Sequence, residues 1–103
     1  MLNIHEVDII YLACGFTDLR KSIDGLSVIV QSQLGLDPFE KALFVFCNRQ
    51  MNKLKVLHFD EGFWLYYHRL ERSKFRWPMS AEEALQVSME ELSWLLKGYD
   101  VIN

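Results

Sequence analysis

The sequence contains no apolar run that approaches the roughly 20 residues needed to cross a bilayer, and its first residues do not resemble a signal peptide. It holds only two cysteines, Cys14 and Cys47, each inside an apolar run and in neither C-x-x-C nor C-x-x-H spacing. This pattern is typical of free core thiols and not of a disulfide or a metal site. We therefore predict a cytoplasmic protein that makes no membrane contact and has no metal site or cofactor.

Motifs of the common enzyme classes are missing as well, because the chain has no H-E-x-x-H, G-x-S-x-G, P-loop or G-x-G-x-x-G sequence. Residue types used in metal-dependent phosphodiester cleavage do occur, at Asp18, Asp24, His58, Asp60, Glu61 and His68. Acidic residues between two strands are explained more simply by turn formation. We predict that the protein is not an enzyme, with a small nuclease as the least favoured alternative.

Apolar residues are plentiful enough to build one folded domain. The 103 residues are 50% hydrophobic and 14% aromatic, and a chain of this size buries roughly two-thirds of the surface that it exposes when unfolded. No repeat, low-complexity tract or internal linker interrupts it. We predict a single domain over residues 1–103.

Sequence periodicity predicts an α+β fold with its elements in the order β-α-β-β-β-α. The first strand is expected in residues 8–15, and three more in residues 42–48, 53–59 and 63–70. The last three strands are joined by short turns, so they should form an antiparallel meander.

Two amphipathic helices are predicted to pack with the meander. Thr17 would cap the first, which ends at Gly35 and whose apolar stripe is Leu19, Ile23, Leu26, Val30 and Leu34. The second would start after Pro78, with a capping box formed by Ser80 and Glu83, and would end at Gly98. Its apolar side would consist of Ala84, Leu85, Leu92, Leu95 and Leu96.

Charge is distributed unevenly along a chain whose net charge is −3. Residues 47–77 hold seven basic and three acidic side chains, a net charge of +4, whereas the flanking segments carry −3 and −4. Because electrostatic fields act locally, a protein that is acidic overall can still present a basic patch. Here the basic patch would lie on the meander.

Alternation along a strand places every second side chain on the same face. Lys53 and Lys55 should therefore share a face, as should Tyr67 and Arg69 on the next strand. Cations beside aromatic rings suit nucleic acid, because cations neutralise phosphates and rings stack on bases. The predicted nucleic-acid-binding residues are Arg49, Lys53, Lys55, Arg69, Arg72, Lys74, Arg76 and Trp77.

Two other interpretations of these charges remain open. The basic face is also consistent with a solvated sheet surface, or with pairing to the acidic last helix of the same or a second copy. Near the start of the first helix, Arg20 and Lys21 are either a second phosphate contact or partners of Asp24 and Glu71 in an internal network.

Four segments, in order, resemble the TnpB transposase accessory proteins of the insertion sequence sixty-six family. The most specific parts are T-D-x-R-K-x-x-D-G-L at residues 17–26, D-P-F and F-V-F within residues 37–46, and R-L-E-x-x-x-F-x-W-P at residues 69–78. The resemblance covers nearly the whole chain. The positions that match the family pattern are Thr17, Asp18, Arg20, Lys21, Asp24, Gly25, Asn48, Arg49, Lys55, Arg69, Leu70, Glu71, Phe75, Trp77 and Pro78.

This resemblance implies a non-catalytic role in bacterial transposition, beside a separate transposase. The implied partners are element DNA, the transposase or both, and an adaptor that contacts only the transposase or a second copy is the alternative. The chain departs from the family pattern at His68, where a lysine is usual, at Gln50 and Met51 in a usually more basic loop, and at Ser73 in place of glycine. The first three departures remove positive charge from the predicted binding face.

Overall fold

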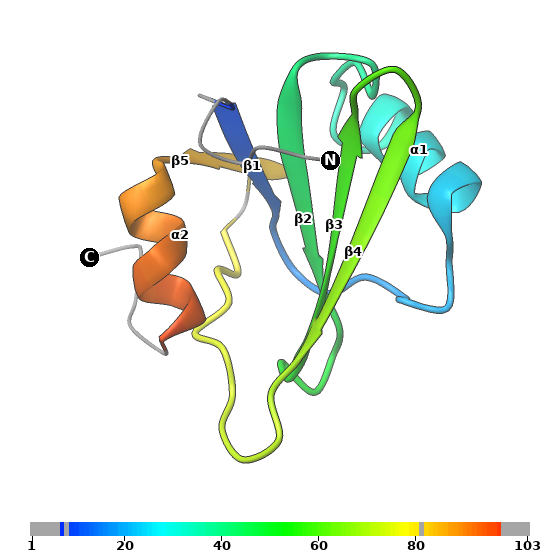
Figure 1. Ribbon diagram of the computed structural model, residues 1–103. Coiled ribbons are helices and arrows are strands. Elements are labelled where there is room, and N and C mark those ends of the chain that lie inside the picture. Colours follow the sequence, from blue (N-terminus) through cyan, green and yellow to red (C-terminus); the bar gives the residue numbers. More distant parts are fainter. Residues whose placement is uncertain (1–6, 8, 81, 98–103) are drawn as a thin grey trace.

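The computed structural model describes residues 7, 9–80 and 82–97 of the chain (Figure 1). It contains five strands and two helices, consistent with the predicted α+β class. In chain order the elements are β1 (Ile9–Ala13), α1 (Ile23–Ser32), β2 (Ala42–Cys47), β3 (Lys53–Phe59), β4 (Phe63–Arg69), β5 (Ala84–Val87) and α2 (Met89–Leu96).

The strands form one mixed sheet in the order β4-β3-β2-β1-β5. β2, β3 and β4 pair antiparallel through short turns, which confirms the predicted meander. β1 pairs parallel with β2, and α1 lies in the connection between them, as a parallel pair requires. Their shared direction brings the carboxyl ends of β1 and β2 to the same end of the sheet.

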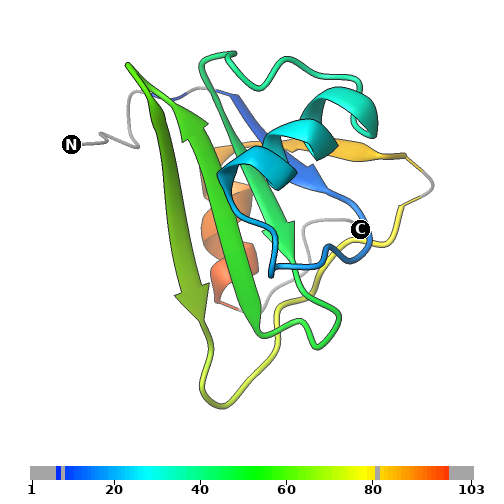
Figure 2. The same ribbon diagram turned by 90° about the vertical axis from the view of Figure 1, so that its right-hand side faces the viewer.

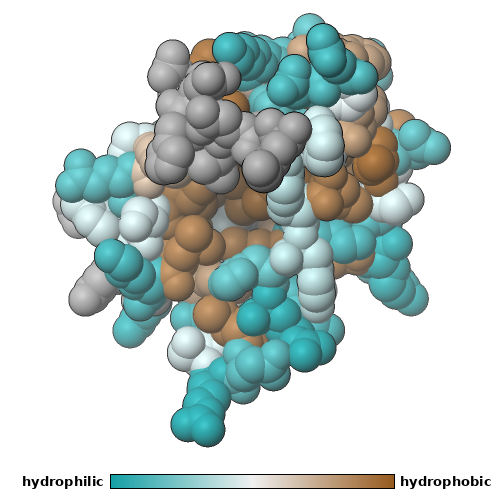
Figure 3. Space-filling view, in the orientation of Figure 1, coloured by the Kyte–Doolittle hydropathy of each residue, from teal (hydrophilic) through white to brown (hydrophobic). Residues whose placement is uncertain are grey.

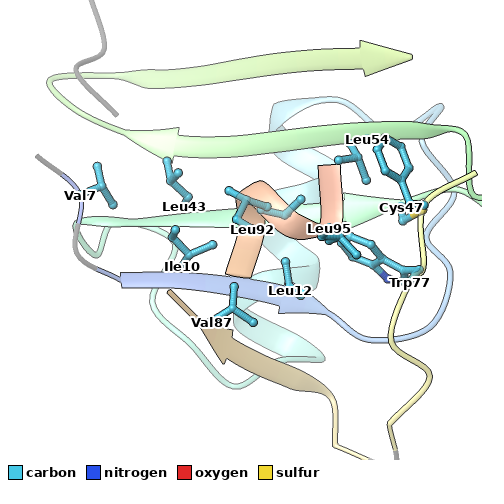
Figure 4. Close-up of a cluster of buried hydrophobic side chains, with 12 residues drawn as sticks. Val7, Ile10, Leu12, Leu43, Cys47, Leu54, Trp77, Val87, Leu92 and Leu95 are labelled. Atoms are coloured by element: carbon cyan, nitrogen blue, oxygen red, sulfur yellow. The ribbon is translucent and has the colours of Figure 1, made fainter. Parts of the chain in front are cut away.

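Both faces of the sheet are covered, so the central strand β2 is buried along its whole length. On one face, Leu26, Ile29 and Val30 of α1 pack against Phe44 and Phe46. On the other face, Leu92 and Leu95 of α2 pack against β1 and β2, as the close-up in Figure 4 shows. Figures 1 and 2 show the resulting three layers, with the sheet between α1 and α2.

The two cysteines differ in their exposure to solvent. Both thiols are free, but Cys14 is partly exposed, so only Cys47 is the buried core thiol that the sequence predicted. Burial raises the pKa of the Cys47 thiol to about 12, because a thiolate is poorly solvated in the core.

Helix α1 begins later than predicted, at Ile23 and not near Thr17. The carboxylate of Asp18 accepts a hydrogen bond from the backbone N–H of Arg20, at 3.0 Å, and so stabilises a turn in place of a first helical turn. The helix ends at Ser32, and Gly35 follows with a left-handed φ of 65°, the conformation expected just beyond a helix end.

The predicted start of the last helix is wrong, because residues 84–87 form strand β5. The sequence contains two similar capping motifs eight residues apart, and the second one is used. The Ser88 hydroxyl accepts from the Glu91 N–H, and the Glu91 carboxylate accepts from the Ser88 N–H, both at 3.0 Å. Residues 84–87, which precede this motif, pair antiparallel with β1 and provide hydrogen-bond partners for the outer backbone groups of β1. This pairing outweighs the local preference of the segment for a helix. The predicted end at Gly98 lies outside the described residues.

Candidate functional site

An open groove of about 920 Å³ lies at the end of the sheet where β1 and β2 finish. Three parts of the chain form it: the loop after β1, the turn after β2, and the facing ends of β3 and β4. Loops at the carboxyl ends of parallel strands commonly form ligand sites, because neighbouring strands bring them together. The lining residues are Phe16, Thr17, Asp18, Leu19, Arg20, Asn48, Arg49, Gln50, Lys53, Lys55 and Tyr67.

The β3–β4 register places the predicted cations of these strands on one face. Lys53 lies opposite Arg69, and Lys55 lies opposite Tyr67. This is the α1 side of the sheet, because Leu57, two residues beyond Lys55, packs in the same cluster as α1. The Lys55 ammonium donates a hydrogen bond of 3.1 Å to the Lys21 carbonyl oxygen, which ties the strand to the loop before α1.

The turn after β2 is organised by the side chain of Asn48, which is only 8% exposed. Its carbonyl oxygen accepts hydrogen bonds from the backbone N–H groups of Asn52 and Lys53, both at 3.0 Å. Its amide donates to the Asn52 and Gln50 side chains. Arg49 and Gln50 lie in this turn and are exposed. The turn therefore presents Arg49 from a fixed backbone.

The loop after β1 forms the opposite wall of the groove. The Thr17 N–H donates to the Cys47 carbonyl oxygen at 2.8 Å, which attaches the loop to the end of β2. The Arg49 guanidinium lies 5.7 Å from the centre of the Phe16 ring, within range for a cation–π contact. These contacts hold the loop and the turn side by side.

Arg20 pairs with Asp18 in this loop and makes no network with Asp24 and Glu71. The Arg20 and Asp18 side chains approach to 2.7 Å, and these hydrogen bonds lower the pKa of the Asp18 carboxyl to about 2. Glu71 instead pairs with Arg69, at 2.8 Å, which raises the pKa of Arg69. The predicted internal network of Arg20, Lys21, Asp24 and Glu71 is therefore wrong.

In the segment after β4, residues 74–77 alternate between exposed and buried side chains. Phe75 and Trp77 are buried against the α2 side of the sheet, whereas Lys74 and Arg76 are exposed. Backbone hydrogen bonds attach the segment to the turn after β2, for example from the Phe75 N–H to the Met51 carbonyl oxygen at 2.7 Å. Figure 3 shows mainly hydrophilic surface at the lower end of the molecule, where Figure 1 places this segment.

Trp77 is a core residue and is removed from the set of predicted nucleic-acid contacts. Its ring is 5% exposed, and its indole N–H donates to the Ala13 carbonyl oxygen at 2.9 Å. A ring in this position has no face on which a base could stack. Among the remaining predicted contacts, Arg69 lies opposite Lys53 but does not line the groove, and Arg72, Lys74 and Arg76 lie beyond it, past the turn after β2.

The residue types considered for metal-dependent cleavage do not converge. His58 is buried, and its Nδ1 lies 2.9 Å from the Ala42 carbonyl oxygen. Asp60 and Glu61 lie in the β3–β4 turn, at the end of this hairpin opposite the groove that contains Asp18. Among the described residues, no group of three or more histidine, cysteine, aspartate or glutamate side chains could hold a metal ion.

Sequence reasoning missed Phe16 and Gln50 as groove residues. Strand alternation was sufficient to place Lys53, Lys55, Tyr67 and Arg69. The position of Phe16 depends on the parallel pairing of β1 with β2, whose register no local sequence signal predicts.

Positions that match the family pattern meet in this groove, because residues 17–20 of the first motif segment line it together with Asn48 and Arg49. The sequence model of a protein family described as IS66 Orf2 like protein matches residues 8–103 of this chain. The chain belongs to this family. Membership connects it with the IS66 insertion sequence and with transposition.

Two proteins of Sinorhizobium fredii (strain NBRC 101917 / NGR234) are similar to this family member. The uncharacterized protein y4hO is 39% identical over 92 residues, which cover 88% of this chain and 80% of y4hO. The uncharacterized protein y4jC is 36% identical over 84 residues, which cover 81% of this chain and 72% of y4jC. No solved structure matches the chain. Within the described residues, no helix has the length and apolarity to cross a membrane.

Proposed function

We propose that the protein is a non-catalytic accessory of IS66 transposition that binds the phosphate backbone of element DNA in the bacterial cytoplasm. The observation that carries this proposal is the convergence of Arg49, Lys53 and Lys55 on one open groove in a chain with a net charge of −3. Cations gathered in this way release counterions from DNA, which drives binding to any sequence. The proposed contacts are Arg49, Lys53, Lys55, Arg69, Arg72, Lys74 and Arg76.

The contacts should contribute unequally. Arg69 is already paired with Glu71, and Arg20 with Asp18, so each would exchange an existing partner for a phosphate. Arg49 lies against a ring and has no carboxylate partner among the described residues. We therefore assign the main electrostatic contribution to Arg49, Lys53 and Lys55, with Arg72, Lys74 and Arg76 extending the surface past the turn.

Aromatic rings in the same groove extend the proposal to unpaired bases. Tyr67 is 55% exposed, lies opposite Lys55 and shares its strand face with Arg69. Phe16 lines the opposite side of the groove and is also exposed. Exposed rings beside cations are the usual elements of single-strand binding, so frayed element ends are a suitable ligand.

A second candidate function is docking on the transposase through helix α2. Trp94 is 43% exposed and Leu96 is 39% exposed on this helix, which also carries Glu90 and Glu91 in its first turn. Exposed apolar side chains beside acidic ones suit a partner with a basic rim around an apolar surface. This function is compatible with DNA binding, because α2 covers the face of the sheet opposite α1.

Two binding measurements distinguish these functions. In the first, fluorescence anisotropy compares a labelled duplex carrying the ends of the protein's own element with a scrambled duplex, at low salt. In the second, the partner transposase is captured by the tagged protein after nuclease treatment, which removes bridging nucleic acid. DNA binding predicts an anisotropy increase with both duplexes. No anisotropy change, together with nuclease-resistant capture that Trp94→Ala abolishes, would leave only the adaptor.

A further inference from the structure

Strand β4 is one border of the sheet. It lies outermost in the strand order and pairs with β3 on its inner side over seven consecutive residues. Figure 2 shows it along the left border of the sheet. In the part of the chain that the structure describes, no strand pairs with its outer side. With respect to these described residues, its outward N–H and C=O groups are available to another strand.

Protein sheets usually protect such borders by a short edge strand, a proline, a lysine or an interruption of the register. The opposite border follows this rule, because β5 spans only four residues. β4 does not follow it: its sequence FWLYYHR has no proline or lysine, and its register with β3 is unbroken. Trp64 is 40% exposed on this strand. The border is long, regular and aromatic, which suits strand pairing with a partner.

Charge changes sign from one end of β4 to the other. The turn before the strand contains the exposed acids Asp60 and Glu61, whereas the exposed bases Arg69 and Arg72 lie at its end and just beyond, where they outnumber the one acid, Glu71. Two copies of β4 in antiparallel arrangement would bring the acidic start of each beside the basic end of the other. A parallel arrangement would bring like charges together, which is unfavourable between neighbouring strands.

We propose that two copies of this protein pair antiparallel through β4, with the twofold axis near Tyr66. In this register Tyr66 lies opposite its counterpart in the second copy, and Trp64 lies opposite His68. Phe63 lies opposite Arg69, so no position within the paired strands faces a residue of like charge. Just beyond the strands Asp60 lies opposite Arg72, and Glu61 lies opposite Glu71, whose charge is offset by its ion pair with Arg69. Aromatic and cation–π pairs of this kind stabilise neighbouring strands. The two sheets become one continuous sheet.

This register also determines on which side of the continuous sheet the two grooves lie. Residues opposite each other across the twofold axis lie on the same side of the sheet, because they are separated by an even number of positions. Both grooves therefore open on the same face of the dimer. The inference stands independently of DNA binding, because Tyr66 lies on the α2 side of β4 and does not line the groove.

Light scattering coupled to size-exclusion chromatography tests this proposal with three samples. The wild-type protein should have about twice the chain mass of 12.2 kDa. Tyr66→Lys and Tyr66→Glu should each elute near the monomer mass, because each places like charges opposite each other at the twofold axis. An equimolar mixture of the two variants should recover the dimer mass, since lysine then lies opposite glutamate.

Trp94→Lys is the matched control, because it also replaces an aromatic residue by a charge, at an exposed position on α2 and away from β4. It should remain a dimer. Circular dichroism establishes that each variant is folded. If a variant does not fold, the mass of the wild-type protein still tests the proposal. A monomeric wild type, dimeric Tyr66 variants, or a mixture of folded monomeric variants that does not recover the dimer mass would each overturn the proposal.

Discussion

Lys53 and Arg69 lie directly opposite each other on the paired strands β3 and β4, so two positive charges occupy one cross-strand pair. Like charges in this position destabilise a sheet by roughly 0.2–1 kcal/mol relative to a neutral pair. Glu71 offsets part of this repulsion through its 2.8 Å ion pair with Arg69. A cationic pair that opposes folding is consistent with selection for binding.

Lys53→Thr should therefore stabilise the fold while it weakens DNA binding. Threonine favours strands and removes the repulsion, so we expect the free energy of unfolding to rise by up to about 1 kcal/mol. Urea denaturation measures this free energy, and anisotropy on the same preparation measures affinity. A variant that is less stable and binds equally well would contradict the assignment of Lys53 to a binding surface.

Trp77→Phe should separate the structural role of the R-L-E-x-x-x-F-x-W-P segment from DNA binding. The substitution keeps an aromatic ring but leaves the buried Ala13 carbonyl oxygen without its 2.9 Å donor. We expect a loss of about 1–3 kcal/mol in the free energy of unfolding. DNA affinity at a temperature where the variant is folded should be unchanged. A large loss of affinity in the folded variant would instead return Trp77 to the binding surface.

The Asp18–Arg20 pair should persist in mild acid. Its hydrogen bonds lower the pKa of the Asp18 carboxyl from 3.8 to about 2. A carboxyl whose pKa is lower in the folded state stabilises it above the unfolded pKa, and this contribution disappears as the pH falls through the folded pKa. The contribution should therefore be present above about pH 4 and lost towards pH 2.

An NMR titration of the Asp18 side-chain carboxyl carbon measures this pKa. In Arg20→Gln the midpoint should return towards the ordinary value for aspartate. An unchanged Asp18 midpoint in the variant would show that Arg20 is not the cause of the shift.

The meander could be predicted because its signals are local. Alternating side chains along β3 and β4 and the short turns between strands were sufficient to define which residues share a face. β5 was missed because its four residues follow a capping motif that resembles the one actually used, at Ser88. Its conformation depends on pairing with β1, which is a contact distant in sequence.

The candidate site was predicted in part for the same reason. The face shared by Lys53, Lys55 and Arg69 follows from a period of two, but the groove also requires the loop after β1 to lie beside the turn after β2. That proximity follows from parallel strand pairing across helix α1. Trp77 was misassigned because alternation in an irregular segment does not indicate which side faces the core.

The most direct test of the proposed DNA-binding surface is the salt dependence of duplex affinity. For the wild type and for Arg49→Gln/Lys53→Gln, the logarithm of the association constant is plotted against the logarithm of salt concentration. Each phosphate contact contributes about 0.9 to the slope, so loss of two contacts should reduce its magnitude by about 1.8. The control Lys41→Gln/Lys97→Gln removes two exposed charges outside the groove and should keep the wild-type slope. Equal slopes for all three proteins would contradict the account.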